Sequence, residues 1–190
     1  MKHKIIYIPG LGDGYDPLRA RALRLWESRD VAIELAPMQW YAGDAYERVF
    51  DGIHRLITQS QKDGYAVSLV GESAGGSMAI DIFAAHPTVH RLVTIAGVNS
   101  PHAPVAQYIR DKAPAFDGAL RALSTSLAAL SDTERTRIIN FTARADSTVS
   151  PKHSHIAGAK HRTVPMIGHL TTVAYCLTLG RKRIIHSITR

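Results

Sequence analysis

Short hydrophobic runs alternate along the chain with longer segments in which hydrophobic residues recur every three or four positions. The short runs have the length of single buried strands and lie at 4–9, 31–37, 65–71, 91–97, 137–143 and 161–167. The longer segments predict helices over 17–29, 44–62, 74–86, 117–130 and about 170–180. We therefore expect a three-layer α/β/α sandwich with a mainly parallel, six-stranded sheet.

Proline and glycine mark several of the boundaries between these elements. Asp16 is the expected cap of the first helix, with Pro17 in its first turn, and Gly180 is the expected end of the last helix before a basic tail. The stretch 98–134 is irregular and holds three prolines before its helix. We expect one domain over residues 1–190, with 98–134 as a small cap excursion.

The composition is that of a globular protein, with 45% hydrophobic and 21% charged residues. No hydrophobic run approaches the roughly 20 residues of a transmembrane segment, and the first run is too short for a signal peptide. The single cysteine, Cys176, cannot form an intramolecular disulfide. A cytoplasmic location is therefore expected.

The formal net charge of +7 raises the question of a nucleic-acid partner. Basic clusters lie at 19–24 and 181–183, but neither zinc-ligand spacing nor an RNA-binding aromatic signature accompanies them. Nucleic-acid binding is therefore not expected. Solvated helix faces and a basic tail explain the charge, although anionic substrates or surfaces stay open as partners.

The sequence Gly71-Glu72-Ser73-Ala74-Gly75 is the strongest chemical signal in the chain. Chance predicts roughly 0.07 matches to Gly-x-Ser-x-Gly in a chain of this composition, so the motif alone does not decide. It lies at a junction between a predicted strand and a predicted helix, where a nucleophilic serine sits on a sharp turn. The alternative is a glycine-rich turn with a bystander serine.

A serine nucleophile needs a base and an orienting acid. Among ten histidines, only His169 follows the carboxyl end of a predicted strand and opens a helix; a capping or surface histidine is the alternative. Asp146 lies just past the fifth strand and is the best-placed acid, although an Asx-turn also explains it. Glu72 is expected to act as a local electrostatic modifier of Ser73.

Backbone N–H groups of Ala74 and Leu11 are the expected oxyanion donors. Ala74 follows the nucleophile, and Leu11 lies in the glycine-rich loop 9–14 after the first strand. A simple glycine turn is an alternative for that loop. Binding of a phosphate group by this loop is a weaker interpretation, because no complete phosphate-binding glycine motif is present.

Together these motifs resemble the α/β-hydrolase superfamily, particularly its small single-domain bacterial members. The segments that carry the resemblance are IPGLGDG, GESAGG, ARADSTVSP and IGH, and the order Ser73, Asp146, His169 is that of the superfamily. Two departures are the absence of an N-terminal antiparallel hairpin and Pro9 where a histidine often stands.

The resemblance implies a serine hydrolase that cleaves carboxylic esters or thioesters through an acyl-enzyme, with no metal or organic cofactor. An acyltransferase or amidase using the same triad, or a non-catalytic binding or scaffold protein, stays open. Trp40 and Tyr108 are the proposed substrate-binding residues, although gap-filling and helix packing explain them as well. The sequence does not indicate an oligomeric state.

Overall fold

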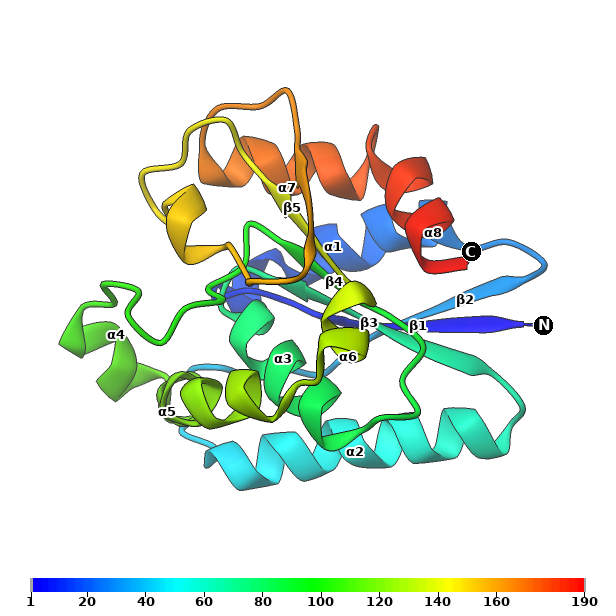
Figure 1. Ribbon diagram of the computed structural model, residues 1–190, viewed down its shortest axis with the longest axis horizontal. Helices are drawn as coiled ribbons and strands as arrows, with labels where there is room; N and C mark the ends of the chain where they lie inside the picture. The colour runs from blue at the N-terminus through cyan, green and yellow to red at the C-terminus, as the bar shows by residue number, and fades with distance from the viewer. Residues whose placement is uncertain (1, 190) are drawn as a thin grey trace.

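A computed structural model describes residues 2–189, and its centre is a sheet of six parallel strands (Figure 1). The strand order is β2-β1-β3-β4-β5-β6, and every neighbouring pair is parallel. Their bounds are β1 His3–Ile8, β2 Val31–Leu35, β3 Ala66–Glu72, β4 Leu92–Ile95, β5 Ile138–Thr142 and β6 Lys160–Thr163. The predicted six-stranded parallel sheet is confirmed.

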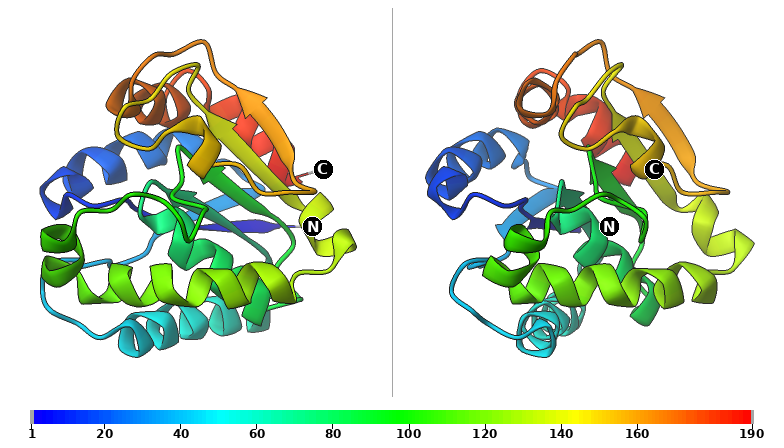
Figure 2. Two further views of the ribbon diagram at one scale, coloured as in Figure 1. Left: turned by 60° about the vertical axis from the view of Figure 1, so that its left-hand side comes forward. Right: turned by 90° about the vertical axis from the view of Figure 1, so that its left-hand side faces the viewer.

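Helices cover both faces of the sheet and complete the predicted three layers (Figures 1 and 2). One face carries α1 (Asp16–Leu23), α7 (His169–Leu177) and α8 (Arg181–Thr189). The other carries α2 (Tyr46–Lys62), α3 (Gly75–Ala85) and α5 (Pro114–Ala129). Two short helices, α4 (Gln107–Lys112) and α6 (Asp132–Thr136), flank α5.

Strand β1 shows why the sheet needs both helical layers. Successive side chains of a strand point to opposite faces, and the last four positions of β1 are all hydrophobic. Ile5 and Tyr7 belong to the core beneath α1, α7 and α8, whereas Ile6 and Ile8 belong to the core beneath α2, α3 and α5. Burial on both faces stabilises the central strands by removing nonpolar area from water.

Several local predictions need correction. The expected basic tail is helix α8, because Ile184 and Ile188 recur at helical spacing and are buried against the sheet layer. The N-cap of α1 is Tyr15 rather than Asp16, whose carboxylate instead binds Arg19 at 2.9 Å. Two additional short helices, α4 and α6, occupy stretches expected to be irregular.

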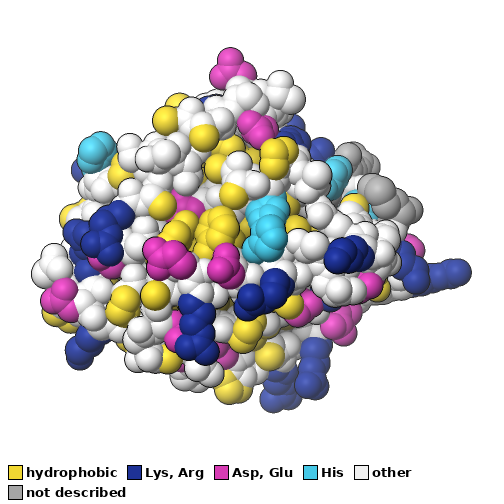
Figure 3. Space-filling model, turned by 90° about the horizontal axis from the view of Figure 1, so that it is seen from below, with side chains coloured by type: hydrophobic (Ala, Val, Ile, Leu, Met, Phe, Trp, Pro, Cys, Tyr) yellow, Lys and Arg dark blue, Asp and Glu magenta, His cyan; other side chains and the backbone are white. Residues whose placement is uncertain are grey.

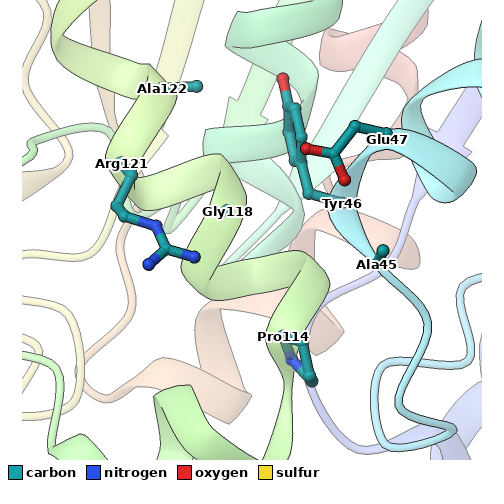
Figure 4. A pocket seen from close by; sticks show the side chains of 7 residues that line it. All are labelled: Ala45, Tyr46, Glu47, Pro114, Gly118, Arg121 and Ala122. Atoms are coloured by element: carbon teal, nitrogen blue, oxygen red, sulfur yellow. The ribbon is translucent and has the colours of Figure 1, made fainter.

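Most of the excursion 98–134 is packed core structure. Phe116, Leu120 and Leu123 of α5 lie in the hydrophobic core with α2 and α3. Figure 4 shows the groove of about 490 Å³ where Tyr46 and Glu47 of α2 face Gly118 and Arg121 of α5. A Cβ at Gly118 would lie 2.3 Å from Cβ of Tyr46, so glycine allows the two helices to approach.

Asp81 on α3 is a buried carboxylate, only 3% exposed, and neither of its oxygens has a hydrogen-bond partner within residues 2–189. Burial raises the pKa of Asp81 to about 7, and the nearby Ser126 hydroxyl opposes this only in part. The folded protein therefore holds a proton between about pH 4 and 7 that the unfolded chain releases. Stability from this group is present below pH 4 and is lost as the pH rises through 7.

We expect the Asp81→Asn substitution to remove this loss of stability at rising pH. Relative to wild type, the variant should gain about 4 kcal/mol in unfolding free energy between pH 4 and pH 8, following three pKa units at about 1.4 kcal/mol each. Urea unfolding of both proteins across this range measures the difference, and Asp51→Asn, at an exposed position of α2, is the control. A difference independent of pH would contradict this account.

The surface seen from the side of α2 carries mixed charges. In Figure 3, lysine and arginine side chains alternate with acidic, histidine and hydrophobic ones, and no single basic patch covers this face. Within residues 2–189, no helix combines the length and hydrophobicity needed to cross a membrane.

Candidate active site

Ser73 lies in a sharp turn between β3 and α3, at the carboxyl edge of the sheet. Its φ of 49° is in the left-handed region, where a residue with a Cβ is strained. The turn is held by hydrogen bonds from Ser73 N–H to the Ile95 carbonyl (3.0 Å) and from Val98 N–H to the Ser73 carbonyl (2.9 Å). These contacts with β4 and the loop after it fix the strained conformation.

Glycines allow the backbone to close tightly around this turn. A Cβ at Gly75 would lie 2.2 Å from the Ile8 carbonyl oxygen, and a Cβ at Gly71 would lie 2.6 Å from the Gly75 carbonyl oxygen. Gly10 faces Ser73 directly, since its Cβ would lie 2.8 Å from that of the serine. The three glycines thus bring β1, β3 and α3 into contact at Ser73.

The predicted base and acid lie beside the serine. His169 Nε2 is 2.9 Å from Ser73 Oγ, and His169 Nδ1 is 2.8 Å from Asp146 Oδ2. The side chains are enclosed, with 11% of His169 and 2% of Asp146 exposed. Residues from the ends of β3, β5 and β6 therefore meet in one hydrogen-bonded row.

Local backbone structure positions the acid and the base. Asp146 Oδ1 accepts the backbone N–H groups of Thr148 and Val149 at 2.8 and 2.9 Å, so the Asx-turn and the histidine contact use different oxygens of one carboxylate. Gly168, with φ 93°, begins the turn into α7, and its N–H donates to Ala145 at 2.8 Å. This bond ties the loop carrying His169 to the loop carrying Asp146.

The Asp146→Asn substitution is expected to lower kcat about 10³- to 10⁴-fold. The loop N–H groups should hold the new amide oxygen, leaving the NH₂ group toward His169 Nδ1. His169 would then carry its proton on Nε2 and could not accept one from Ser73. Ester turnover measures the effect, with Asp132→Asn at an exposed site as control; wild-type turnover in Asp146→Asn would move the orienting role elsewhere.

Leu11, in the loop after β1, and Ala74 carry the two backbone N–H groups that we expect to bind an oxyanion. Within residues 2–189, neither Leu11 N–H nor Ala74 N–H donates to a protein acceptor. Ala74 is the N-cap of α3, where helical N–H groups are free and the dipole favours negative charge. Gly12, with φ 96°, turns the loop directly after Leu11.

A buried ion pair holds this loop against the nucleophile turn. Arg19, 6% exposed, binds Glu72 through Nε (2.9 Å to Oε2) and Nη2 (2.6 Å to Oε1). The same guanidinium donates to the carbonyls of Leu11 (3.3 Å) and Gly12 (2.9 Å). Tyr7 donates its hydroxyl to Glu72 at 2.6 Å. One arginine therefore bridges the loop after β1, which we call the oxyanion loop for its expected role, and the residue preceding Ser73.

Burial and the charge of Glu72 shift the pKa values of Arg19 and Tyr7. Burial opposes the positive form of Arg19, but the hydrogen bonds and charge of Glu72 outweigh it and raise the arginine pKa above its usual value. Burial, together with Glu72, raises the pKa of Tyr7 well above its usual value. The arginine thus stays charged and the tyrosine neutral, as their hydrogen bonds to the carboxylate require.

The two proposed substrate-binding residues occupy different places. Trp40 is buried, and its indole N–H donates to the Pro9 carbonyl at 3.1 Å, so it supports the start of the loop after β1. Tyr108 is 64% exposed and lines a groove of about 450 Å³ with Tyr41, Ile109 and Lys112. Tyr41 N–H lies 3.4 Å from Asp13 Oδ2, which places this groove beside the oxyanion loop.

A second hollow lies on the other side of the nucleophile turn. Its volume is about 280 Å³, and it lies between the loop after β4 and the loop that carries Asp146. The side formed by the loop after β4 is nonpolar, with Val98, Ala103, Pro104 and Val105, whereas the facing side is mainly polar, with Ser147, Thr148, Ser150, Lys152 and His153 around Val149. Val98 also donates to the Ser73 carbonyl, so this hollow adjoins the serine. Within residues 2–189, no group of three histidine, cysteine or acidic side chains is arranged to hold a metal ion.

Neither a family model nor a curated protein sequence matches the chain. Solved structures match its shape: a monoacylglycerol lipase of Paleococcus ferrophilus is 10% identical, with a TM-score of 0.66 over 97% of this chain and 93% of the lipase. Est1E of Butyrivibrio proteoclasticus is 15% identical, with a TM-score of 0.67 over 100% and 89% of the two chains. A meta-cleavage product hydrolase of Pseudomonas fluorescens IP01 is 13% identical, with a TM-score of 0.62 over 97% and 90%.

Proposed function

We propose that this chain, which has the α/β-hydrolase fold, is a serine hydrolase that cleaves carboxylic esters or thioesters. The observation that carries the proposal is the row Ser73–His169–Asp146, with contacts of 2.9 and 2.8 Å, on a strained turn at the carboxyl edge of the sheet. Such a row supplies a nucleophile, a base and an orienting acid at one point. The names of the similar structures, a monoacylglycerol lipase and a meta-cleavage product hydrolase among them, support the same reaction class.

The reaction proceeds in two steps. Ser73 Oγ attacks the carbonyl carbon while His169 Nε2 accepts the hydroxyl proton, and the N–H groups of Leu11 and Ala74 bind the oxyanion. The carbon–oxygen or carbon–sulfur bond then breaks, and His169 returns the proton to the departing alkoxide or thiolate. Water, activated by His169, attacks the acyl-enzyme, releases the carboxylic acid and restores the Ser73 hydroxyl.

The surroundings of Ser73 favour acyl groups of small to medium size. The hollow beside Val98 has a volume of about 280 Å³ and one nonpolar side, formed by the loop after β4, which suits a short acyl chain. The groove at Tyr41 and Tyr108 lies across the oxyanion loop and would receive the leaving group. A cytoplasmic location belongs to this proposal and rests on the single, buried Cys176.

A panel of p-nitrophenyl esters and matching thioesters tests the proposal. We expect kcat/KM to be highest for acetyl or butanoyl and to fall for octanoyl. Adding an alcohol or amine acceptor separates hydrolysis from acyl transfer through the products formed. No turnover above the buffer rate for any ester or thioester would favour the binding or scaffold alternative.

Arg19 is expected to act as a positioning residue for the oxyanion loop. Replacing Arg19 with methionine should lower kcat about 10- to 100-fold with little change in KM, because Leu11 N–H loses its fixed place. It should also destabilise the fold, since Glu72 is left buried without its partner.

The double variant Arg19→Met/Glu72→Gln separates the two effects. Removing the unpaired charge should restore much of the melting temperature, whereas kcat should stay low because the loop carbonyls still lack their donor. Recovery of kcat together with the melting temperature would assign Arg19 a structural role only.

A further inference from the structure

The net positive charge of the chain comes entirely from its last part. The first 146 residues hold 16 basic and 16 acidic residues and are neutral. Residues 147–190 hold the other seven lysines and arginines and neither aspartate nor glutamate. The basic excess is therefore more localised than the clusters at 19–24 and 181–183 indicate.

The fold gathers part of this charge in one groove between β6 and α8. The groove has a volume of about 510 Å³ and is lined from both sides. Its lining residues are Phe141, His161, Arg162, Thr163, Val164, Arg183, His186 and Ser187. None of them is acidic. β6 is also an edge strand of the sheet, so one side of the groove is open to solvent.

The two arginines in the groove are free to bind a ligand. Within residues 2–189, neither Arg162 nor Arg183 forms an ion pair, whereas Arg19, Arg110 and Arg121 all pair with acidic residues. Both free side chains are exposed and come from opposite walls of the groove. Two unpaired guanidinium groups that line one hollow can each donate hydrogen bonds to the oxygens of a phosphate group.

The other polar side chains of the lining differ in whether they already have a hydrogen-bond partner within the protein. His161 Nε2 lies 3.1 Å from the Ile156 carbonyl, and the Ser187 hydroxyl donates to the Arg183 carbonyl at 2.8 Å. Among the described residues, the His186 imidazole has no such partner. It supplies a further hydrogen-bonding group on the α8 side of the groove.

We propose that this groove binds a small molecule that carries one or more phosphate groups. Its concave shape and its volume fit a ligand of nucleotide size, with Arg162 and Arg183 binding the phosphate oxygens. The lining includes none of Ser73, Asp146 and His169, so this site is separate from the chemistry proposed for Ser73; Figure 1 shows α8 at the end of the molecule where both chain termini lie.

Protection of an exposed sheet edge is the competing explanation for charges on β6. It accounts for Lys160 and Arg162 on the strand, but it does not require Arg183, which comes from a helix across the groove. The two explanations differ in whether a ligand binds.

Calorimetric titration of the full chain with pyrophosphate and with ATP, both without divalent cations, tests the proposal. The double variant Arg162→Gln/Arg183→Gln should lower the affinity for either ligand about 10- to 100-fold. The control Arg21→Gln/Arg29→Gln removes the same charge from exposed positions and should change affinity less than about twofold. Circular dichroism verifies that both variants are folded.

Three results would overturn the proposal. The first is that neither pyrophosphate nor ATP binds to the wild type. The second is an equal loss of affinity in both double variants, which would indicate attraction by net charge alone. The third is binding of a DNA oligonucleotide or of phosphatidylglycerol vesicles without binding of pyrophosphate or ATP, which would assign the surface to a macromolecular or lipid partner.

Discussion

Turnover of short-chain esters is expected to fall about 10⁴- to 10⁶-fold in the Ser73→Ala variant. The substitution removes Ser73 Oγ, the atom that we propose attacks the carbonyl, whereas His169 and Asp146 keep their contact. A small residual rate should survive, because the N–H groups of Leu11 and Ala74 can still polarise a bound ester. Steady-state kinetics with a p-nitrophenyl ester measures the loss.

Stability should change little in this variant. Alanine meets the same backbone strain as serine at φ 49°, and the Ser73 backbone bonds are unaffected. Ser124→Ala, at an exposed position of α5, is the matched control and should keep wild-type turnover. Retention of more than about a tenth of the wild-type kcat in Ser73→Ala would exclude Ser73 as the nucleophile.

Substituting alanine at Gly75 is expected to destabilise the protein by about 3 kcal/mol or more and to abolish turnover. The added Cβ would lie 2.2 Å from the Ile8 carbonyl oxygen and 2.7 Å from that of Pro9. Both obstacles are backbone atoms at the end of β1, so relief requires α3 or the oxyanion loop to move. Urea unfolding measures the stability, and ester turnover measures the damage to the site.

Gly52→Ala is the matched control for this prediction. A Cβ at Gly52 would meet no atom within 4 Å, and the residue lies inside helix α2. Alanine there should stabilise the fold by about 0.5–1 kcal/mol, because glycine is the poorer helix former. Equal unfolding free energies for Gly75→Ala and wild type would show that the contact between β1 and α3 is looser than described.

The sheet could be predicted from the sequence because each strand carries its own local signal. β1, β3 and β5 are short, mainly hydrophobic segments, as burial between two helical layers requires. Helix α8 could not be recognised in the same way. Its few hydrophobic residues, including Ile184 and Ile188, follow the basic run 181–183, and a short basic segment of that kind also fits a solvated tail.

The residues of the candidate site also differ in whether the sequence could predict them. Ser73, Asp146 and His169 each follow a strand, and parallel strands place their carboxyl ends at one edge, so their meeting followed from topology. Arg19 gave no such signal. It lies in a helix with other arginines, and only the crossing of α1 over β3 brings it to Glu72. A contact between distant segments has no local pattern from which to be inferred.

Labelling with a fluorophosphonate probe, read out by intact-protein mass and peptide mapping, tests most directly whether Ser73 is an activated nucleophile. The account predicts one adduct per wild-type chain, located on Ser73, and none on the folded Ser73→Ala variant. A folded wild-type protein without an adduct, or equal labelling of the two proteins, would contradict it.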